Sequence, residues 1–328
     1  MASHRTFAEQ ALHYFIRDHQ GAPPAEVDHP AAWTGPDLAA RADRWTTTLS
    51  ADEIAELEGA ARAAINGGRP MDVLDADTVP LPLLEPRIAG WRAELSDGLG
   101  VVVVRGLPVR QWGTEMASYA YWILGHHLGT PGAQNPDGEL LGHVTDYGEA
   151  DRPMARKYRS AGDIAFHCDS ADVVGLLCLR TAKEGGQSRI ASSIAVYNTL
   201  ASEHPDLASE LTEPFSIDRR DEQAPGEPAW FDIAPTTWDG TRLRTFWHSD
   251  YMRSAERHDG VEFSPSRRAT IDAFDDIAGR DETHMDMWLE EGDIQFISNH
   301  TVVHARTGYV DHDDPDERRH LLRLWLSL

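Results

Sequence analysis

Residues 164–169 read Ile-Ala-Phe-His-Cys-Asp, a short apolar run that closes on a His-x-Asp triplet. Side chains on a β-strand alternate between its two faces, so we expect His167 and Asp169 on one face and Cys168 on the other. Far downstream, residues 299–304 read Asn-His-Thr-Val-Val-His, and His304 offers a second imidazole. Two histidines and one carboxylate on one face of an iron(II) ion leave positions open for a co-substrate and oxygen. The pattern therefore predicts a metal centre at His167, Asp169 and His304.

Other interpretations of these residues stay open at this point. The chain has 16 histidines, so chance clusters are expected, and an isolated His-x-Asp triplet is also typical of a polar strand end. His300 lies four residues before His304 and competes with it for the role of distal ligand. We interpret Asp163 as a turn residue. A further group is considered as pocket lining: Trp247, His248 and Tyr251.

Short apolar and β-branched segments dominate the chain from residue 98 onward. Residues 101–104 are four consecutive valines, which favours a buried strand. Further strands are predicted at 140–144, 164–167, 173–179, 188–191, 215–217, 229–233, 242–247, 293–297, 302–306 and 321–326. Many short strands with helices grouped N-terminally indicate a mainly β fold with flanking helices, an antiparallel double-sheet barrel or jelly roll.

The predicted helices lie before and between these strands. Residues 53–65 and 115–128 have helical spacing, and two helical insertions are expected at 195–203 and 266–277. Residues 1–97 are expected to be helical and to buttress one sheet face, with the β core in 98–328. We therefore expect one domain over residues 1–328.

The C-terminal strand carries a second signal. If residues 319–325 are extended, Arg319 and Arg323 share one face, while the opposite face is almost wholly apolar. Guanidinium groups match carboxylates in a bidentate manner, so two arginines about 13 Å apart along a strand could hold two different anions. Ordinary salt bridges with the abundant acidic residues are the alternative.

Composition limits the classes of function. A formal charge of −24 makes nucleic acids and anionic membranes poor partners, and no apolar run approaches the length of a membrane span. Two cysteines exclude a disulfide framework and a four-cysteine zinc site within one chain. We expect a cytoplasmic protein with a small-molecule substrate, and leave open whether it forms a homo-oligomer.

Taken together, these motifs resemble the iron(II)/2-oxoglutarate dioxygenases of the taurine dioxygenase type, within the clavaminate synthase-like superfamily. The resemblance covers roughly residue 98 to the C-terminus and rests on 166–169, 185–188, 292–296, 299–304 and 319–323. It implies a double-stranded β-helix, with iron(II) held by His167, Asp169 and His304. Oxygen and 2-oxoglutarate would be consumed, and succinate and carbon dioxide formed.

The resemblance also assigns roles outside the metal ligands. Arg319 matches the arginine that binds the distal carboxylate of 2-oxoglutarate, and Ser188 falls where the family usually has a threonine hydroxyl. Arg323 falls where several relatives hold an anionic group of the primary substrate. Related halogenases have a small residue in place of Asp169, so hydroxylation, desaturation or ring formation is expected here.

Two other classes of function remain as alternatives. A metal-dependent hydrolase or isomerase could use zinc at the same triad and would not need Arg319. A non-catalytic jelly-roll module could bind a small acid, although a complete ligand set argues against it.

Overall fold

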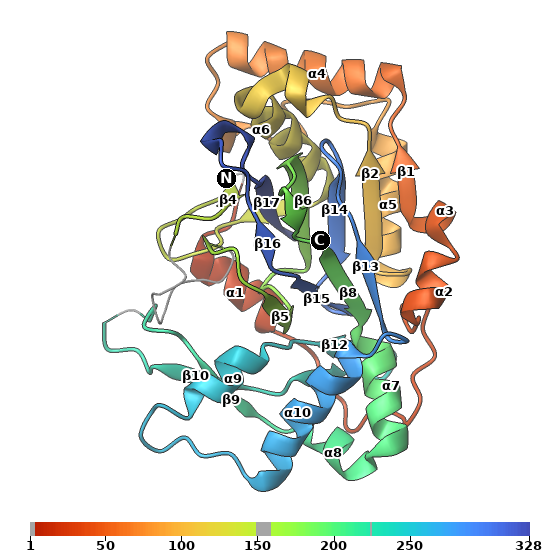
Figure 1. The fold of residues 1–328 in the computed structure, drawn as a ribbon, viewed down its shortest axis with the longest axis vertical. Helices are drawn as coiled ribbons and strands as arrows, with labels where there is room; N and C mark the ends of the chain where they lie inside the picture. Colours follow the sequence, from red (N-terminus) through yellow and green to blue (C-terminus); the bar gives the residue numbers. More distant parts are fainter. Residues whose placement is uncertain (1–3, 149–158, 224) are drawn as a thin grey trace.

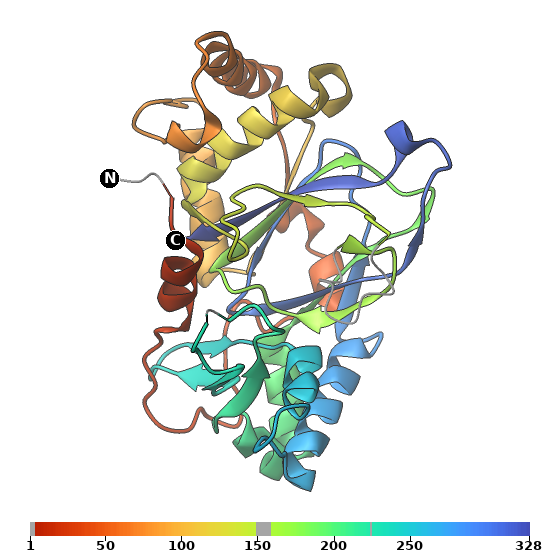
Figure 2. The ribbon, with the colours of Figure 1, turned by 90° about the vertical axis from the view of Figure 1, so that its left-hand side faces the viewer.

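The computed structural model describes residues 4–148, 159–223 and 225–328. Two β-sheets lie at the centre of the molecule, with α4 to α6 gathered at one end and α7 to α10 at the other (Figures 1 and 2). The helices are α1 (Phe7–Phe15), α2 (Gly35–Ala39), α3 (Ala42–Trp45), α4 (Ala51–Asn66), α5 (Glu85–Asp97), α6 (Val109–Leu128), α7 (Ser193–Glu203), α8 (Pro205–Glu210), α9 (Ser249–Ala255) and α10 (Pro265–Gly279). The strands are β1 (Thr46–Thr48), β2 (Val101–Arg105), β3 (Thr130–Gly132), β4 (Gly142–Val144), β5 (Ile164–His167), β6 (Val173–Arg180), β7 (Glu184–Gly185), β8 (Ser188–Ser192), β9 (Phe215–Asp218), β10 (Trp230–Ile233), β11 (Thr236–Trp238), β12 (Leu243–Thr245), β13 (His284–Met287), β14 (Ile294–Ser298), β15 (Val302–Arg306), β16 (Tyr309–Val310) and β17 (His320–Ser327).

The larger sheet has the strand order β1-β2-β14-β6-β17-β3, with β4 alongside β17. The smaller sheet has the order β13-β8-β15-β5, and all its pairings are antiparallel. Within the described residues, no strand pairing joins the two sheets into a closed barrel. Two mainly antiparallel sheets with helices around them confirm the predicted mainly β jelly roll with flanking helices.

The valine run explains how the larger sheet is covered on both faces. Val102 and Val104 join the hydrophobic cluster formed with α4, α5 and α6, while Val101 and Val103 join the cluster that includes the smaller sheet. Alternation along a strand sends successive side chains to opposite faces, and both faces here are apolar. A continuous β-branched run is therefore what this position requires.

In the first 97 residues, five helices, α1 to α5, alternate with irregular segments, and one short strand was not predicted. Thr46–Thr48 forms β1, which pairs in parallel with β2 at the edge of the larger sheet. Three residues are too few for a sequence pattern to reveal a strand. α4 begins at Ala51, two residues before the predicted helical segment, because the Ser50 hydroxyl and the Glu53 carboxylate satisfy each other's backbone N–H groups.

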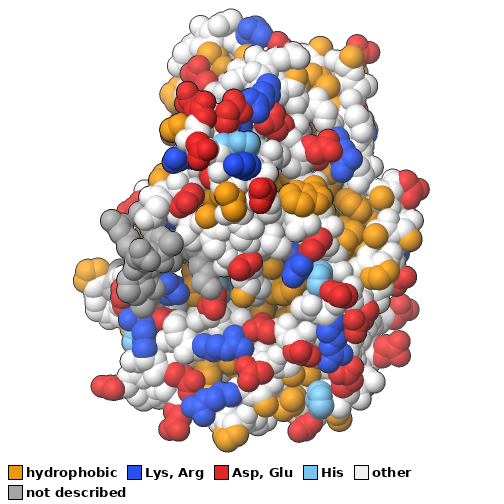
Figure 3. Space-filling model, in the orientation of Figure 1, with side chains coloured by type: hydrophobic (Ala, Val, Ile, Leu, Met, Phe, Trp, Pro, Cys, Tyr) orange, Lys and Arg blue, Asp and Glu red, His pale blue; other side chains and the backbone are white. Residues whose placement is uncertain are grey.

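Acidic and basic side chains are interspersed over the face drawn in Figure 3. Among the described residues, no helix combines the length and the apolar composition that a membrane crossing needs.

Candidate active site

The smaller sheet brings the predicted metal ligands together. β5 ends at His167, and the antiparallel pairing of β15 with β5 sets His304 directly opposite it. Ligand atoms of His167, Asp169 and His304 all lie within 4.8 Å of one another. The Nε2 of His304 is 3.7 Å from the Oδ2 of Asp169, and the two imidazole centres are 4.2 Å apart.

The donor set fits a divalent iron ion. The Oδ2 of Asp169 is buried without a hydrogen-bond partner among the described residues, as expected of an oxygen that faces a metal. The Nδ1 of His167 lies 2.9 Å from the carbonyl oxygen of Ala165, so the ring can donate there and turn Nε2 toward the ion. Burial, followed by the nearby His167 ring, lowers the pKa of His304 to about 3. His304 is therefore neutral at physiological pH, the form that binds metals.

Asp169 is charged although it is buried. Burial opposes ionisation, but the nearby charge of Arg323 holds the pKa of the Asp169 carboxyl below its usual value. The Nη1 of Arg323 is 3.8 Å from Oδ1, and the backbone N–H of Asp169 donates to the side chain of Asn299 at 3.0 Å. Asp169 is thus fixed through both its backbone and its side chain.

His300 has a different environment. Its Nε2 lies 2.8 Å from the Oδ1 of Asp172, and its ring stacks on Tyr14 with 5.1 Å between centres. Of the two candidate distal histidines, the structure therefore brings His304, and not His300, to His167 and Asp169.

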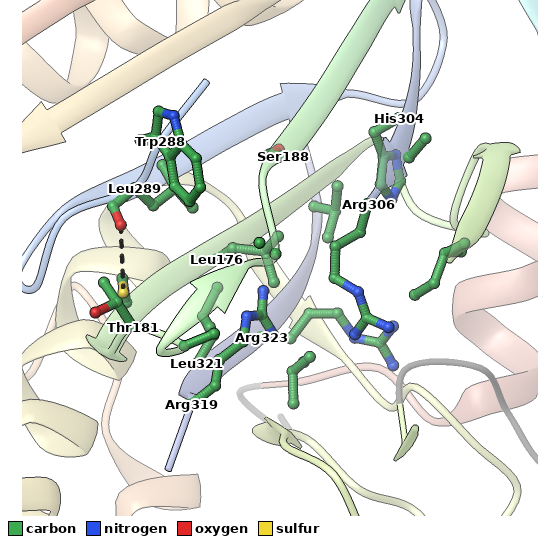
Figure 4. A pocket seen from close by; sticks show the side chains of 18 of the residues that line it. Leu176, Thr181, Ser188, Trp288, Leu289, His304, Arg306, Arg319, Leu321 and Arg323 are labelled. Atoms are coloured by element: carbon green, nitrogen blue, oxygen red, sulfur yellow. Dashed lines mark hydrogen bonds between the residues drawn. The ribbon is translucent and has the colours of Figure 1, made fainter. Parts of the chain in front are cut away.

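A small cavity beside the triad collects the remaining predicted residues. Ser188, Arg319 and Arg323 line it together with the apolar side chains of Leu176 and Leu321 (Figure 4). Arg319 comes directly before β17 and is only 6% exposed. The hydroxyl of Ser188 donates to the side-chain oxygen of Gln295 at 2.9 Å.

Arg306 lines the same cavity and was missed in the sequence. Its guanidinium carbon lies 4.8 Å from the centre of the Tyr309 ring, and that of Arg319 lies 5.0 Å from the same ring. Burial, followed by the charge of Arg319, lowers the pKa of Arg306 to about 10. The signal was present in the sequence, because His304 and Arg306 are two residues apart and so share a strand face.

The charge of this cavity calls for an anionic ligand. The Nη1 of Arg319 and the Nε and Nη1 of Arg306 are buried without hydrogen-bond partners in the part of the chain described. Two desolvated cations in one small cavity are costly unless an anion balances them. A dicarboxylate with one end at the metal and the other at these arginines would do so.

A larger cavity of about 670 Å³ opens on the other side of the triad. His167, Asp169 and Arg323 line both cavities, so the metal position lies between them. Arg323 also donates through Nε to the Gln134 side chain at 2.6 Å, which fixes its head group beside Asp169.

Of the three residues predicted to line the pocket, two line the larger cavity and one does not. His248 and Tyr251 line the larger cavity and stack with 3.5 Å between ring centres. Trp247 does not line either cavity, and its prediction as a lining residue is wrong. It is fully buried against Phe274 and donates to Asp275 at 2.8 Å, and both of these residues belong to α10.

Two more residues near the triad have structural roles. Asp163 directly precedes β5 and accepts a hydrogen bond from the backbone N–H of Gly308 at 2.7 Å, which joins two segments far apart in the chain. Cys168 points into the core, and burial raises the pKa of its thiol to about 12. The thiol therefore stays protonated and is a poor nucleophile.

Fold and site define a class, a jelly-roll protein with a His-Asp-His centre and a cationic cavity for an acid. A sequence profile described as "Taurine catabolism dioxygenase TauD, TfdA family" matches residues 67–325. The chain is 32% identical over 292 residues to FR-33289 synthase of Streptomyces rubellomurinus, covering 88% of this chain and 86% of that protein. It is 25% identical over 302 residues to the taurine hydroxylase-like protein SAT17 of Stachybotrys chartarum, covering 89% and 77%.

Solved structures share the fold at lower identity. An asparagine oxygenase with Fe(II), hydroxyasparagine and succinate superposes with a TM-score of 0.65 at 18% identity, covering 86% of this chain and 93% of that one. The non-heme iron oxygenase OrfP with iron and α-ketoglutaric acid gives 0.63 at 16% identity, covering 86% and 94%. The chain belongs to the TauD/TfdA family. It is an iron(II)- and 2-oxoglutarate-dependent oxygenase.

Proposed function

We propose that His167, Asp169 and His304 hold the iron, that Arg319 and Ser188 bind the distal carboxylate of 2-oxoglutarate, and that Arg323 binds an anionic group of the primary substrate. The observation that carries this proposal is the pair of buried, unbalanced guanidinium groups in the small cavity beside the triad. Bidentate pairing with a carboxylate would satisfy them.

Iron, 2-oxoglutarate and oxygen supply the oxidising chemistry and yield succinate and carbon dioxide. The protein orients the reactants and excludes water from them. Arg319 orients the acid from its far end, the buried cavity keeps water out, and Asn299 and Arg323 hold Asp169 in place. Arg323 adjoins both cavities and can align the substrate with the reacting centre.

The substrate class follows from the charge at the boundary of the two cavities. We expect a small molecule with an anionic or amino-acid-like end, consistent with the taurine-related names of the family and of SAT17 and with the hydroxyasparagine bound to the asparagine oxygenase. Hydroxylation, desaturation or ring formation is expected. Halogen transfer is not, because Asp169 fills the third protein position at the metal.

Anaerobic addition of iron(II) and 2-oxoglutarate to the metal-free protein tests this proposal. Chelation by the keto acid should produce a weak visible charge-transfer band, which a zinc hydrolase or a non-catalytic module would not give. Screening small acids for succinate formation would identify the substrate. Mass spectrometry of the product in chloride and bromide buffers should show no halogen, and a chlorinated product would refute the role given to Asp169.

The proposal extends to the organisation of the protein. We expect residues 1–328 to behave as one oxygenase domain, with 1–97 as a buttress and 98–328 as the catalytic core. Limited proteolysis should then give no stable fragment that ends near residue 97. We also expect a cytoplasmic location, tested by cell fractionation. Analytical ultracentrifugation would distinguish a monomer from a homo-oligomer.

A further inference from the structure

α1 lies outside the region matched by the family profile, yet it is attached to the metal-binding segment. The helix spans Phe7–Phe15 and runs along the side of the sheets next to the C-terminus (Figure 2). The side chain of Gln10 donates to the carbonyl of Ser170 at 3.3 Å, one residue after a metal ligand. The Nε2 of His13 lies 2.8 Å from the carboxylate of Asp172.

A third anchor reaches the same region. The hydroxyl of Tyr14 donates to the carbonyl of Asn299 at 3.0 Å, and Asn299 in turn accepts the backbone N–H of Asp169. Tyr14 and Gln10 are both fully buried. The polar side of α1 therefore faces the protein and fixes the helix relative to the metal site.

The apolar side of the same helix faces the larger cavity. The lining residues of α1 are Phe7, Ala8, Ala11, Leu12 and Phe15, whose spacing forms one continuous helical face. Phe7 and Phe15 also pack against the hydrophobic core, whereas Ala8 and Leu12 on the same face are exposed. Leu12 is 62% exposed, although it adjoins a cavity that leads to the triad.

The apolar lining continues from α1 toward the metal position. Phe231, Ile233, Phe246 and Trp325 line the same cavity, which also contains His167, Asp169 and Arg323. A ligand whose charged end lies at Arg323 would thus meet an apolar wall on the α1 side. Charged residues line other parts of the cavity, among them Asp218, Arg219, Arg220 and Asp250. About 670 Å³ is within the range of sites that bind drug-sized molecules, and is more than a simple amino acid fills.

We propose that α1 forms an apolar subsite of the substrate cavity, and that the primary substrate carries an aliphatic or aromatic group several carbons long beyond its anionic end. This inference rests on the proposed function, because it assumes that the cavity beside the triad receives the molecule to be oxidised. The apolar group of the substrate occupies this subsite, and the side chains of α1 limit the size of the group that fits.

Two series of probes test the subsite, linear alkanesulfonates and linear alkanoates of two to eight carbons. Their affinity for the anaerobic iron(II)·2-oxoglutarate protein would be measured by calorimetry. Burial of each added methylene against α1 should raise affinity roughly fourfold, until the wall is covered. Leu12→Ser and Ala8→Asp should flatten this dependence, with about fivefold to tenfold weaker binding of the longest probes and little change for the shortest.

Ile16→Ser is the matched control. Ile16 follows α1, is 70% exposed and does not line the cavity, so this variant should keep the wild-type dependence on chain length. Melting temperature and 2-oxoglutarate affinity should be unchanged in all three variants. The subsite is refuted if neither series shows a chain-length dependence in the wild type, or if Leu12→Ser and Ile16→Ser behave alike.

The same samples separate the two proposals. If the visible band forms with iron(II) and 2-oxoglutarate but chain length has no effect, only the α1 subsite fails. If the band does not form in the wild type, the proposed co-substrate site fails as well. Elution of the wild type as a dimer that dissociates in Leu12→Ser would assign the apolar face to a second copy of the chain, and would overturn the inference.

Discussion

Asp169 is a buried carboxylate that must stay charged, and its neighbours explain how it does so. Arg323 lies 3.8 Å from one oxygen, while the other oxygen faces the two histidines. A bound divalent ion would add to the positive charge on that side. Single residues at this site therefore act through charge balance, and replacing any of them changes the environment of the others.

The distal ligand can be tested by comparing two histidines four residues apart. His304→Ala should abolish turnover and the visible band and should lower the iron content, because it removes a metal ligand. His300→Ala should keep the iron but lower the free energy of unfolding by about 1–3 kcal/mol, because it removes a buried partner of Asp172. Iron analysis and urea denaturation measure the two effects. Iron retained in His304→Ala and lost in His300→Ala would reverse the assignment.

Arg319 and Arg323 should differ in the ligand that they bind. Hydrogen bonds to charged groups are worth about 1.5–3 kcal/mol, so Arg319→Ala should raise the dissociation constant of 2-oxoglutarate by roughly 10- to 150-fold. Arg323→Lys, which keeps the positive charge beside Asp169, should weaken substrate binding and leave substrate-free succinate formation largely intact. Arg318→Ala is the control, because Arg318 is exposed and precedes Arg319 in the chain. Equal loss of 2-oxoglutarate binding in both variants would contradict this division.

Arg306 should contribute to the affinity for the co-substrate. Arg306→Gln keeps polar donors but removes one of the two buried charges, so it should weaken 2-oxoglutarate about tenfold. Binding of a monocarboxylic 2-oxo acid should change less, because that acid lacks the distal carboxylate. Calorimetry with both acids measures the ratio. An equal effect on both would make Arg306 a structural residue, which its hydrogen bonds to the carbonyls of Ser160 and Gly162 also permit.

At the scale of elements, β6 is enclosed on several sides, because it lies between β14 and β17 and contacts α6. Gly175 sits in its middle, and a Cβ built there would lie 2.4 Å from the hydroxyl oxygen of Tyr121 and 2.8 Å from the ring of Phe296. Tyr121 and Phe296 can pack this closely against the backbone of β6 only because residue 175 has no side chain.

Two glycine-to-alanine substitutions should therefore change the free energy of unfolding in opposite directions. Gly175→Ala should lower the free energy of unfolding by about 1–3 kcal/mol, because the packed core must move to admit a methyl group. Gly90→Ala lies within α5, where an added Cβ meets nothing within 4 Å. It should stabilise the protein by about 0.5–1 kcal/mol through helix propensity. Thermal and urea unfolding measure both, and a neutral Gly175→Ala would refute the packing argument.

At the scale of the whole molecule, Asp172 connects three distant parts of the chain. Its carboxylate lies 2.8 Å from both His13 and His300 and accepts the backbone N–H of Leu328 at 2.9 Å. Burial alone would raise the pKa of Asp172, but these contacts lower it to about 2. The Asp172 carboxylate therefore contacts the N-terminal helix, the turn before β15 and the C-terminal residue at the same time.

Asp172→Asn should lower the free energy of unfolding by about 1–3 kcal/mol and loosen α1, because three partly exposed partners lose a charged acceptor: His13, His300 and the backbone N–H of Leu328. In the wild type, the contribution of Asp172 is present above the usual aspartate pKa and should be lost as pH falls through about 2. Asp313→Asn is the control, since Asp313 is exposed. Hydrogen exchange over α1 and urea denaturation would show the difference, and equal stability of the two variants would contradict it.

The sequence by itself determined the local elements and the chemistry that they carry. β5 and β15 begin and end where predicted, because their apolar pattern and polar ends are local properties. Strand alternation also predicted a shared face for His167 and Asp169, and for Arg319 and Arg323. Asp169 lies beyond the end of β5 and Arg319 lies before β17, so their positions depend on the segments that flank these strands.

Only the tertiary structure decided which distant residues meet. The choice of His304 over His300 depends on the register of β15 against β5, which no local pattern encodes. The position of Arg306 beside Arg319, and of α1 along the substrate cavity, depends in the same way on packing between segments far apart in the chain. A strand or helix is specified by its own residues, whereas a site is specified by the free energy of the whole fold.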